Sequence, residues 1–516
     1  MTNSDHRNRS NQTIMGTASP PSLDDFYEGA EILMTGATGF LGKLLIEKLL
    51  RSFPRVKTIY VIVRAKKNQS PQQRIDKMLD TVIFERLEQE VPHFKLKIKV
   101  LSGQLEAPDL GLSPDDKRLV TSKVNLVFHC AATLRFDEEL KEAIRTNMCA
   151  TQTMLDLAKQ CKNLKMFTYV STAFSNSYRK NIEEIIYKAH THYSELLKIS
   201  KLDVDDPKYQ ETRERLSHEN MNTYTLTKAA AEQLLCEEAQ FFPVCIFRPS
   251  IVISTWKEPI PGWIDNLYGP TGLVTGAQAG VVRTFLVDPD VKADIVPADL
   301  VVNALICAPW NGHERFHKDP SCLPIYNYVN SKDNPLTWGE FITKSLKEGV
   351  KIPSSQTLWS YVLYPTRHKV VHYVRCLLLH YLFGYIFDLF AWISGNSLRL
   401  VPIYSKMDKV VSALEPFSTR EWEWDNSNVQ SMWTLVPAGD RVRFPFNIRD
   451  LDWDDYLRAY VRGTLVHHLQ DKLDPVTRQK AWKRHRRLTI AHQCIKALLY
   501  MLLVLFLYTL VTYTLW

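Results

Sequence analysis

The sequence lacks the cysteine patterns that mark zinc sites, redox motifs and disulfide frameworks. Its nine cysteines are dispersed, and none of them forms a C-x-x-C pair. An odd, scattered set of this kind favours reduced thiols in a domain that faces the cytosol. The sequence also shows no cluster with metal-ligand spacing and no Ser–His–Asp arrangement, so hydrolytic chemistry is disfavoured.

Strong charge of either sign is also missing. The net charge is +8 over 516 residues, without any zinc-finger or base-stacking pattern, and the sequence therefore predicts no nucleic-acid partner. A hydrophobic fraction of 45% and a charged fraction of 23% are ordinary for a globular protein and exclude disorder throughout the chain. The mild basic surplus suits acidic small ligands or an anionic membrane face. No pattern in the sequence indicates an oligomeric state.

The amino terminus has no apolar run of the kind that a signal peptide requires. Residues 1–20 are polar and rich in Asn, Ser and Thr, a composition too poor in apolar groups to build a core. We therefore expect a disordered leader over residues 1–27.

The carboxyl terminus is apolar instead. Residues 497–516 contain no Asp, Glu, Lys or Arg, and at about 1.5 Å per residue they match a hydrocarbon core about 30 Å thick. Six basic residues precede this run, as is typical of the cytoplasmic flank of a spanning helix: Arg478, Lys480, Lys483, Arg484, Arg486 and Arg487.

These features predict a single-pass tail anchor over 497–516, preceded by a basic linker over 471–496, with the rest of the chain in the cytosol. The alternative is a buried C-terminal helix. Basic-flanked tail anchors serve both the endoplasmic reticulum and the peroxisome, and this sequence fits either membrane.

Between residues 28 and 340, strand-like and helix-like segments alternate. Helical patterns over 40–50, 143–160 and 225–239 separate apolar strand candidates at residues 30–34, 58–63, 98–101, 124–130, 167–171 and 244–247. This alternation predicts an α/β fold with a Rossmann-type doubly wound parallel sheet, which binds ligands at the carboxyl ends of its strands. Residues 173–223 interrupt it as an insertion of the length usual for a lid or binding loop.

From residue 341 the alternation fades, and we expect a mostly helical C-terminal domain over 341–470. Residues 376–394 are nearly all apolar, with His380, Gly384 and Asp388 among them. A buried or membrane-lying helical pair is the favoured interpretation. A second transmembrane helix is the alternative, and Asp388 would be costly within it.

The strongest local motif is TGATGFLG, which follows the first predicted strand. Gly36 allows a tight turn, Gly39 lets the backbone approach a pyrophosphate, and Gly42 lets the next helix pack closely. The N–H groups at the start of that helix then face the anion. The motif predicts a dinucleotide site formed by Gly36, Thr38, Gly39, Phe40, Leu41 and Gly42.

The residue after the second strand indicates which dinucleotide binds. An NAD site places an acid there, on the ribose hydroxyls, but this chain has Arg64. A guanidinium suits a 2′-phosphate, so we predict NADPH; a solvated basic loop is the alternative. Ala131, which follows the fourth strand, is small enough to let the chain pass close to the cofactor.

Tyr224 and Lys228 have the YxxxK spacing at the start of an Ala-rich helix, and residues four apart share one helical face. An ammonium and a nicotinamide ribose beside the phenol would lower its pKa from about 10. Tyr224 can then hand a proton to a developing alkoxide as a general acid. Asn147, which begins NMCAT, either organises a link near this lysine or caps its helix.

The fifth strand ends in VSTAF, which supplies Ser171 and Thr172. Adjacent strand residues face opposite sides, so one hydroxyl of the pair can bind a carbonyl oxygen that gains charge. We favour Thr172; the alternative for both is local backbone bonding. Together these residues predict hydride transfer.

Several segments resemble known families. TGATGFLG, VSTAF and YTLTK look like an extended short-chain dehydrogenase/reductase. EPIPGWIDNLYGPTG, VPADLVVN and NPLTWG together resemble the alcohol-forming fatty acyl-CoA reductases, and residues 366–463 are similar to that family's C-terminal sterile domain. The resemblance implies that a long-chain acyl-CoA is reduced to a primary alcohol through a bound aldehyde, with two NADPH consumed and CoA released.

Two other interpretations are open at this point. A sterol dehydrogenase or a nucleotide-sugar epimerase also uses YxxxK, but epimerases usually hold NAD, which Arg64 opposes. A non-catalytic, membrane-anchored NADPH-binding scaffold is the second. Loss of the tyrosine or the lysine would have favoured it, and both are present.

Overall fold

The computed structural model describes residues 21–515 except 67, 136–137, 189–190 and 219–221. Among these residues, seven parallel strands form the central sheet, in the order β11-β7-β5-β4-β1-β2-β3. They are β1 (Glu31–Thr35), β2 (Thr58–Val63), β3 (Ile98–Ser102), β4 (Leu126–His129), β5 (Met166–Val170), β7 (Val244–Pro249) and β11 (Ile325–Tyr328). The strand order reverses between β1 and β4, the switch point where doubly wound sheets bind ligands. The predicted Rossmann-type fold is confirmed.

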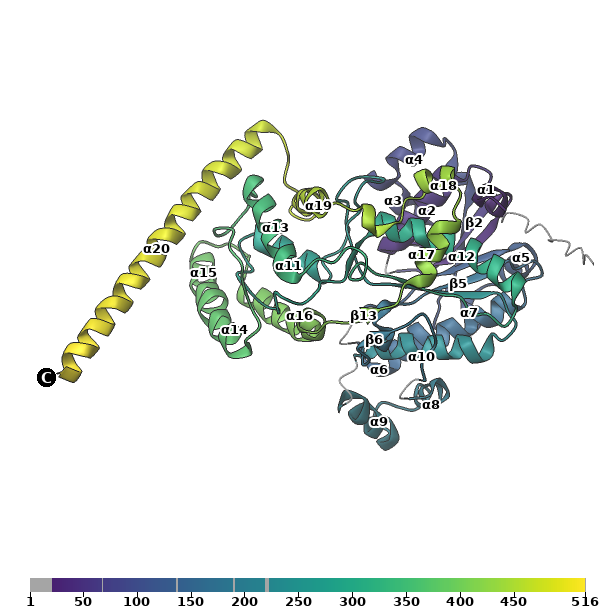
Figure 1. The fold of residues 1–516 in the computed structure, drawn as a ribbon, viewed down its shortest axis with the longest axis horizontal. Coiled ribbons are helices and arrows are strands. Elements are labelled where there is room, and N and C mark those ends of the chain that lie inside the picture. Colours follow the sequence, from purple (N-terminus) through teal and green to yellow (C-terminus); the bar gives the residue numbers. More distant parts are fainter. Residues whose placement is uncertain (1–20, 67, 136–137, 189–190, 219–221, 516) are drawn as a thin grey trace, which may run out of the picture.

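Helices cover both faces of this sheet (Figure 1). On β1, Ile32 and Met34 join one buried cluster and Leu33 joins the other, as the two-residue period of a strand requires. One layer contains α1 (Leu23–Tyr27), α2 (Phe40–Ser52) and α12 (Ala298–Lys318). The other contains α5 (Pro114–Lys123), α6 (Leu140–Ile144), α7 (Ala150–Lys159) and α10 (Thr223–Glu238), and a π-helical turn, Arg145–Cys149, joins α6 to α7.

The predicted leader over 1–27 extends too far. Ser22 and Asp25 form a capping box that starts α1, and such a box satisfies backbone N–H groups at a helix start. Leu23, Phe26 and Tyr27 are buried, and the Tyr27 hydroxyl donates to the Ile306 carbonyl at 2.7 Å. This short helix therefore belongs to the core; residues 1–20 lie outside the described residues.

A second, mostly helical part is built around short strand pairs. The pairs are β8 (Ile251–Ile253) with β10 (Ile295–Pro297), β9 (Thr284–Leu286) with β12 (Tyr364–Thr366), and β6 (Asn181–Ile182) with β13 (Glu423–Trp424). α3 (Pro71–Leu79) packs on β3 and α4 (Glu85–Glu90) on α2, while α8 (Tyr193–Ile199) packs on α10 and α9 (Pro207–His218) contacts α6. The other helices are α11 (Pro270–Gln278), α13 (Trp338–Lys351), α17 (Ser427–Leu435), α18 (Ala438–Arg443) and α19 (Trp453–His467).

The C-terminal part and the Rossmann part share one core. A single buried cluster includes Met34 of β1 and Tyr460 of α19. Two of the strand pairs also join residues on either side of position 340. The predicted boundary near 340 therefore separates segments that fold against each other.

In the part of the chain that the structure describes, two helical segments are long and apolar enough to cross a membrane (Figure 1). The first joins α14 (Lys369–Arg375), a π-helical turn Cys376–Tyr381 and α15 (Leu382–Ile393), and α16 (Val401–Thr419) follows it. It contains all but the last residue of the predicted segment 376–394, and this segment is largely exposed and not buried. The second is α20 (Pro475–Leu515), which projects away from the body and includes residues 475–496 of the predicted linker and 497–515 of the predicted anchor.

Candidate functional site

The glycine loop after β1 has the close packing that its motif predicts. Gly36 has φ 74°, and a Cβ on it would lie 2.8 Å from the Ala131 backbone nitrogen. A Cβ on Gly42 would lie 2.2 Å from the Gly36 carbonyl oxygen. Larger residues are therefore excluded where β1 turns into α2 and passes the end of β4. Gly39 is the N-cap of α2, and no side chain caps that end, which leaves its N–H groups to an anion.

The EPIPGWIDN segment docks beside this helix start. The Trp263 ring stacks on Phe40 with centroids 5.4 Å apart, and Asp265 forms an ion pair with Lys43 at 2.7 Å. The segment is thereby held against the first turn of α2, next to the dinucleotide loop.

The same segment is fixed to the C-terminal part where its backbone crosses that of α19, with a glycine in each chain segment at the point of contact. A Cβ on Gly262 would lie 2.1 Å from the Ala459 carbonyl oxygen, and one on Gly463 would lie 1.8 Å from the Gly262 carbonyl oxygen. Trp256 adds a hydrogen bond from its indole N–H to Asp455 at 3.0 Å. Because backbones approach so closely here, α19 sets the position of the segment that covers α2.

Two arginines lie where β2 ends. Arg64 is exposed, and its carbonyl accepts a 2.6 Å hydrogen bond from the Arg74 guanidinium of α3. Arg74 also donates to the Thr38 hydroxyl of the glycine loop at 3.2 Å. Burial and the neighbouring Arg64 lower the pKa of Arg74. Sequence reasoning missed Arg74, whose only signal was a basic residue in the helix after Arg64.

The YxxxK pair lies at the start of α10, whose first turn is capped by Asn222. The Lys228 ammonium donates to the Val170 carbonyl, at the end of β5, at 2.7 Å and lies 4.5 Å from the centre of the Tyr169 ring. Burial lowers the pKa of Lys228 to about 8. Burial also raises the pKa of the Tyr224 phenol above its ordinary value, and a hydrogen bond with Thr172 opposes that rise.

The two hydroxyls after β5 have different partners. Thr172 is hydrogen-bonded to Tyr224, and its oxygen also accepts from the Phe174 backbone N–H at 3.2 Å. Ser171 instead donates to Glu232 at 2.5 Å, and Glu232 forms a fully buried ion pair with Arg248. Strand alternation therefore places Thr172 with the tyrosine and Ser171 with a structural pair.

Asn147 contacts the loop that follows β4, and His129 is the last residue of that strand. Asn147 accepts from the Thr133 N–H at 2.8 Å and donates to Thr227 of α10 at 3.0 Å, so it ties that loop to the helix carrying Lys228. It lies inside the π-helical turn and is not a helix cap. The His129 ring bonds to Thr35 and Thr151, and burial lowers its pKa to about 3, which indicates a neutral structural imidazole.

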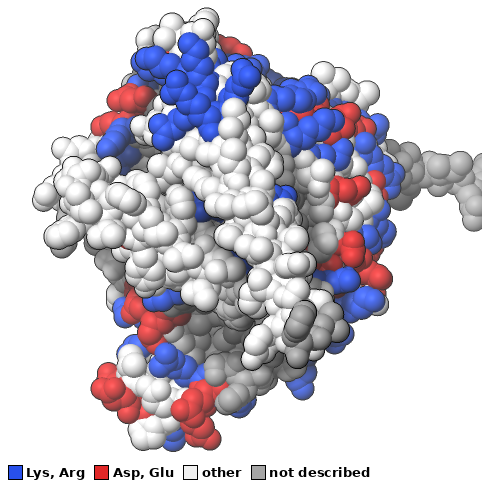
Figure 2. Space-filling view, turned by 90° about the vertical axis from the view of Figure 1, so that its left-hand side faces the viewer, with Lys and Arg blue, Asp and Glu red and all other residues white. Residues whose placement is uncertain are grey.

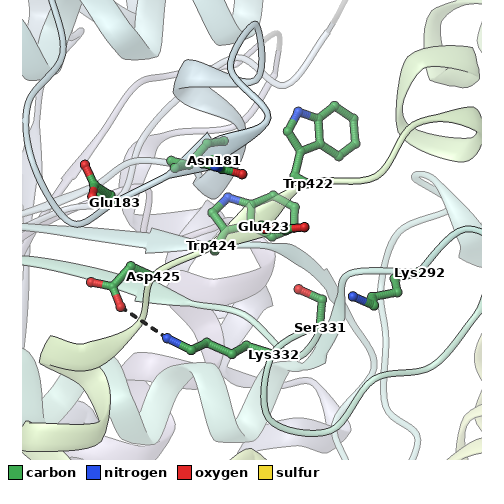
Figure 3. Close-up of a pocket in the computed structure, with 10 residues that line it drawn as sticks. Asn181, Glu183, Lys292, Ser331, Lys332, Trp422, Glu423, Trp424 and Asp425 are labelled. Carbon is green, nitrogen blue, oxygen red and sulfur yellow. Dashed lines mark hydrogen bonds and ion pairs between the residues drawn. The ribbon is translucent and has the colours of Figure 1, made fainter.

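A cavity of 440 Å³ opens where the insertion meets the C-terminal part (Figure 3). It is lined by Asn181, Ile182, Glu183, Lys292, Ser331, Lys332, Trp422, Glu423, Trp424 and Asp425. None of these is a residue that the motifs predict, but the Trp424 indole donates to the Ala173 carbonyl at 3.2 Å, next to Thr172. Its lining carries three carboxylates and two ammonium groups, so its charge does not favour phosphate groups.

The glycine loop, Ala131 and Thr172 therefore share one edge of the sheet. They follow β1, β4 and β5, which are neighbours in the order, and the carboxyl ends of parallel strands meet at one edge. A neutral phenol and a second hydroxyl at this edge can donate to an oxygen that gains negative charge. Among the described residues, no group of three or more His, Cys, Asp and Glu side chains can hold a metal ion.

Comparison with protein families gives two matches. Residues 34–305 match an NAD-binding family model described as male sterility protein, and residues 379–471 match the sterile model, which has the same description.

Curated relatives cover most of the chain. Fatty acyl-CoA reductase 1 of Mus musculus is 37% identical over 454 residues, which is 88% of this chain and 87% of the relative. Fatty acyl-CoA reductase wat of Drosophila melanogaster is 36% identical over 499 residues, 97% of this chain and 95% of the relative.

Solved structures with the same fold include reductase domains of assembly-line synthetases. The terminal R domain of the myxalamid pathway has a TM-score of 0.55 at 20% identity and covers 87% of this chain and 92% of its own. The reductase domain of a non-ribosomal peptide synthetase from Mycobacterium tuberculosis has a TM-score of 0.56 at 17% identity, with 87% and 94% covered. At these identities the likeness supports the fold alone.

Proposed function

Because this chain belongs to the fatty acyl-CoA reductase family, we propose that it reduces long-chain acyl thioesters of coenzyme A to primary alcohols. Its amino-terminal part binds a nicotinamide dinucleotide. The observation that carries the proposal is the set of contacts at one sheet edge: Thr172 bonded to Tyr224, and Lys228 bonded to the end of β5.

The side chains at this edge match the needs of the reaction. Reduction of a thioester to an alcohol takes two hydrides, and two dihydronicotinamide dinucleotides, bound one after the other, would supply one each. At each reduction the carbonyl oxygen gains negative charge, and the Tyr224 and Thr172 hydroxyls donate to it. Burial raises the pKa of the Tyr224 phenol, whereas the sequence predicted that an ammonium and a nicotinamide ribose would lower it. The phenol is protonated at neutral pH in either case and can act as the proton donor. The Lys228 ammonium stabilises the phenolate left behind.

One pair of hydroxyls can serve both reductions. The first yields a hemithioacetal oxygen, and its collapse releases CoA as a thiol and leaves an aldehyde. The second places charge on the same oxygen position, where Tyr224 again gives a proton. Thr172 acts as the fixed donor, since its hydroxyl is already held by contacts with Tyr224 and Phe174.

NADPH is the proposed dinucleotide. Arg64 follows β2 at the position where an NAD site would carry an acid, and the Arg74 guanidinium donates to the Arg64 carbonyl. Two guanidinium groups next to the glycine loop suit a 2′-phosphate. Arg74 is also tied to Thr38, so one side chain connects the phosphate position with the dinucleotide loop.

We assign the carboxyl-terminal helix to a membrane anchor, with the catalytic part on the cytosolic side. α20 extends beyond the body (Figure 1), and its apolar half is exposed along its length. Exposed apolar side chains on a helix of this length fit a bilayer. The basic residues precede this half on the same helix, so they lie at the cytosolic surface.

The test is to incubate membranes containing the full chain with NADPH and acyl-CoAs of graded length, and to measure alcohols and aldehydes. Alcohol formation that disappears with Tyr224→Phe, while NADPH binding persists, supports the proposal. Oxidation of sterols or epimerisation of nucleotide sugars, with no alcohol from acyl-CoA, would assign the chain to another short-chain activity. NADPH binding without any turnover would leave only the scaffold.

A further inference from the structure

The helical hairpin over residues 369–417 exposes an unusually large apolar face. On α14, the π-helical turn and α15, the exposed side chains are Val370, Val371, Tyr373, Val374, Leu377, Leu378, Leu382, Tyr385, Ile386, Leu389, Phe390, Trp392 and Ile393. Figure 2 shows a wide face almost free of charged side chains, with Lys and Arg gathered along its upper edge. Patches of this size on soluble proteins mark interaction sites.

Both ends of the hairpin are held at one place on the catalytic body. The Val287 N–H donates to the Thr366 carbonyl, and the Asp288 N–H donates to the Ser418 carbonyl, each at 2.9 Å. The chain therefore leaves the body and returns to it at two consecutive residues after β9. A helix that crossed a bilayer at 369–393 would require α16 to cross back.

The sequence of α16 opposes a second crossing. Lys406 and Lys409 are exposed on it, and Asp408 is half-buried. Each such charge costs about 2.5–3.5 kcal/mol at the centre of a bilayer. Long lysine side chains near the surface reach the headgroups instead. The hairpin therefore fits one side of a membrane and not its full thickness.

The carboxylate that argued against a transmembrane helix is already hydrogen-bonded inside the hairpin. Asp388 on α15 accepts from the Leu400 N–H at 2.6 Å and from the Val401 N–H at 3.1 Å, so it caps the start of α16. Gly384 lets the two helices approach, since a Cβ there would lie 3.0 Å from the Tyr404 ring. The hairpin thus presents its apolar side chains outward and keeps this carboxylate inside.

The hairpin leaves the body at the same level as α20. The His492 ring accepts from the Trp359 indole at 3.2 Å and bonds to the Tyr364 hydroxyl at 3.3 Å. Tyr364 lies in β12, shortly before α14 begins, and His492 lies shortly before the apolar run of α20. A membrane that contains the apolar run of α20 would therefore also contact the hairpin.

We propose that residues 369–417 form a re-entrant hairpin that inserts into the cytosolic leaflet of the bilayer in which α20 is anchored. This rests on the anchor proposed above and not on the reaction. The lipid bilayer is the partner, because the exposed face is apolar, continuous and bordered by basic residues, as an anionic membrane surface requires.

The test places an environment-sensitive fluorophore on one introduced cysteine at a time in the full chain in liposomes. The exposed Cys494 and the partly exposed Cys130, Cys149, Cys161, Cys236 and Cys322 are first replaced by Ser, which leaves only the buried Cys245, Cys307 and Cys376. The positions are Phe390→Cys in the hairpin, Leu505→Cys in α20 and Val442→Cys on the body, where the side chain is 84% exposed. We expect nitroxide-labelled lipids to quench the labels at 390 and 505, and external iodide to quench only the label at 442.

Three outcomes would overturn the proposal, and they are distinguishable. If iodide quenches the label at 390 as strongly as the label at 442, while the label at 505 is still quenched only by lipid, the hairpin lies outside the membrane and the anchor assignment stands. If external iodide quenches the labels at both 390 and 505, neither segment lies in the bilayer, and the anchor assignment fails as well. If iodide trapped inside the liposomes quenches a label at Asn396→Cys, the tip of the hairpin has reached the far side of the bilayer, and the hairpin spans the membrane. Tyr385→Cys gives a second hairpin position if Phe390→Cys fails to fold, judged by NADPH binding.

Discussion

Ser171 and Thr172 are neighbours with opposite predicted roles, and substituting each in turn separates them. Thr172→Val removes the hydroxyl bonded to Tyr224 and keeps the shape of the side chain. Ser171→Ala removes a 2.5 Å hydrogen bond to Glu232 on the other side of the strand. We expect the first change to lower turnover and the second to lower stability.

The structure sets the size of both effects. Loss of one donor to an oxyanion lowers kcat by about 10²–10³, or about 2.7–4 kcal/mol. A hydrogen bond to a charged group contributes about 1.5–3 kcal/mol. Glu232 keeps two bonds from Arg248, at 2.9 and 2.7 Å, so we expect the lower end of that range for Ser171→Ala.

The assay measures alcohol formation at saturating NADPH and the thermal unfolding midpoint of each variant. Thr172→Ser is the matched control, because it retains the hydroxyl and the acceptor for the Phe174 N–H. Its turnover should stay close to that of the parent chain. Equal losses of turnover in Ser171→Ala and Thr172→Val, with equal midpoints, would refute the assignment of the two faces.

Three further predictions concern the lysine, the arginines and the glycine crossing. Because burial lowers the pKa of Lys228 to about 8, its ammonium loses a proton as pH rises through 8, and kcat/KM should fall over that range. A pH profile of kcat/KM that stays flat to pH 10 would contradict this prediction. Arg64→Ala and Arg74→Ala should each lower the kcat/KM ratio of NADPH over NADH about tenfold or more, and steady-state kinetics with an unchanged ratio would place the 2′-phosphate elsewhere. Gly463→Ala puts a Cβ 1.8 Å from a carbonyl oxygen of the docked segment and should destabilise the chain by about 1–3 kcal/mol. Gly439→Ala, with nothing within 4 Å, should leave the unfolding midpoint unchanged.

Much of the sheet could be predicted from the sequence because its strands are buried on both faces. Such strands are continuous apolar runs, and the strand predicted over 58–63 is β2 with the same bounds. The roles of Gly36 and Gly42 could also be predicted, since glycines at this spacing after a strand form the tight turn and the close helix packing of a dinucleotide-binding loop. Alternation along β5 predicted that Ser171 and Thr172 face opposite sides. The choice between them depended on how α10 packs on the strand, which the sequence does not contain.

Contacts between distant segments were not predictable. β6 and β13 have two residues each and pair across more than 200 positions, so neither carries a periodic signal. Arg74 meets Thr38 only because α3 turns back toward the glycine loop. The apolar composition of residues 376–394 would be the same whether they pack against protein or against lipid. Only the fold, in which most of these side chains are exposed, distinguishes the two cases.

The pairing of β6 with β13 has a consequence for synthesis. The chain is made from its amino terminus, so the loop after Thr172 is complete long before Trp424 can donate to the Ala173 carbonyl. The hairpin over 369–417 lies between these two events. A ribosome must therefore deliver the apolar hairpin before β13 emerges. A chain that stops at residue 420 would contain the glycine loop, Thr172, Tyr224 and Lys228 but would lack the β6–β13 pair and the contact of Trp424 with Ala173.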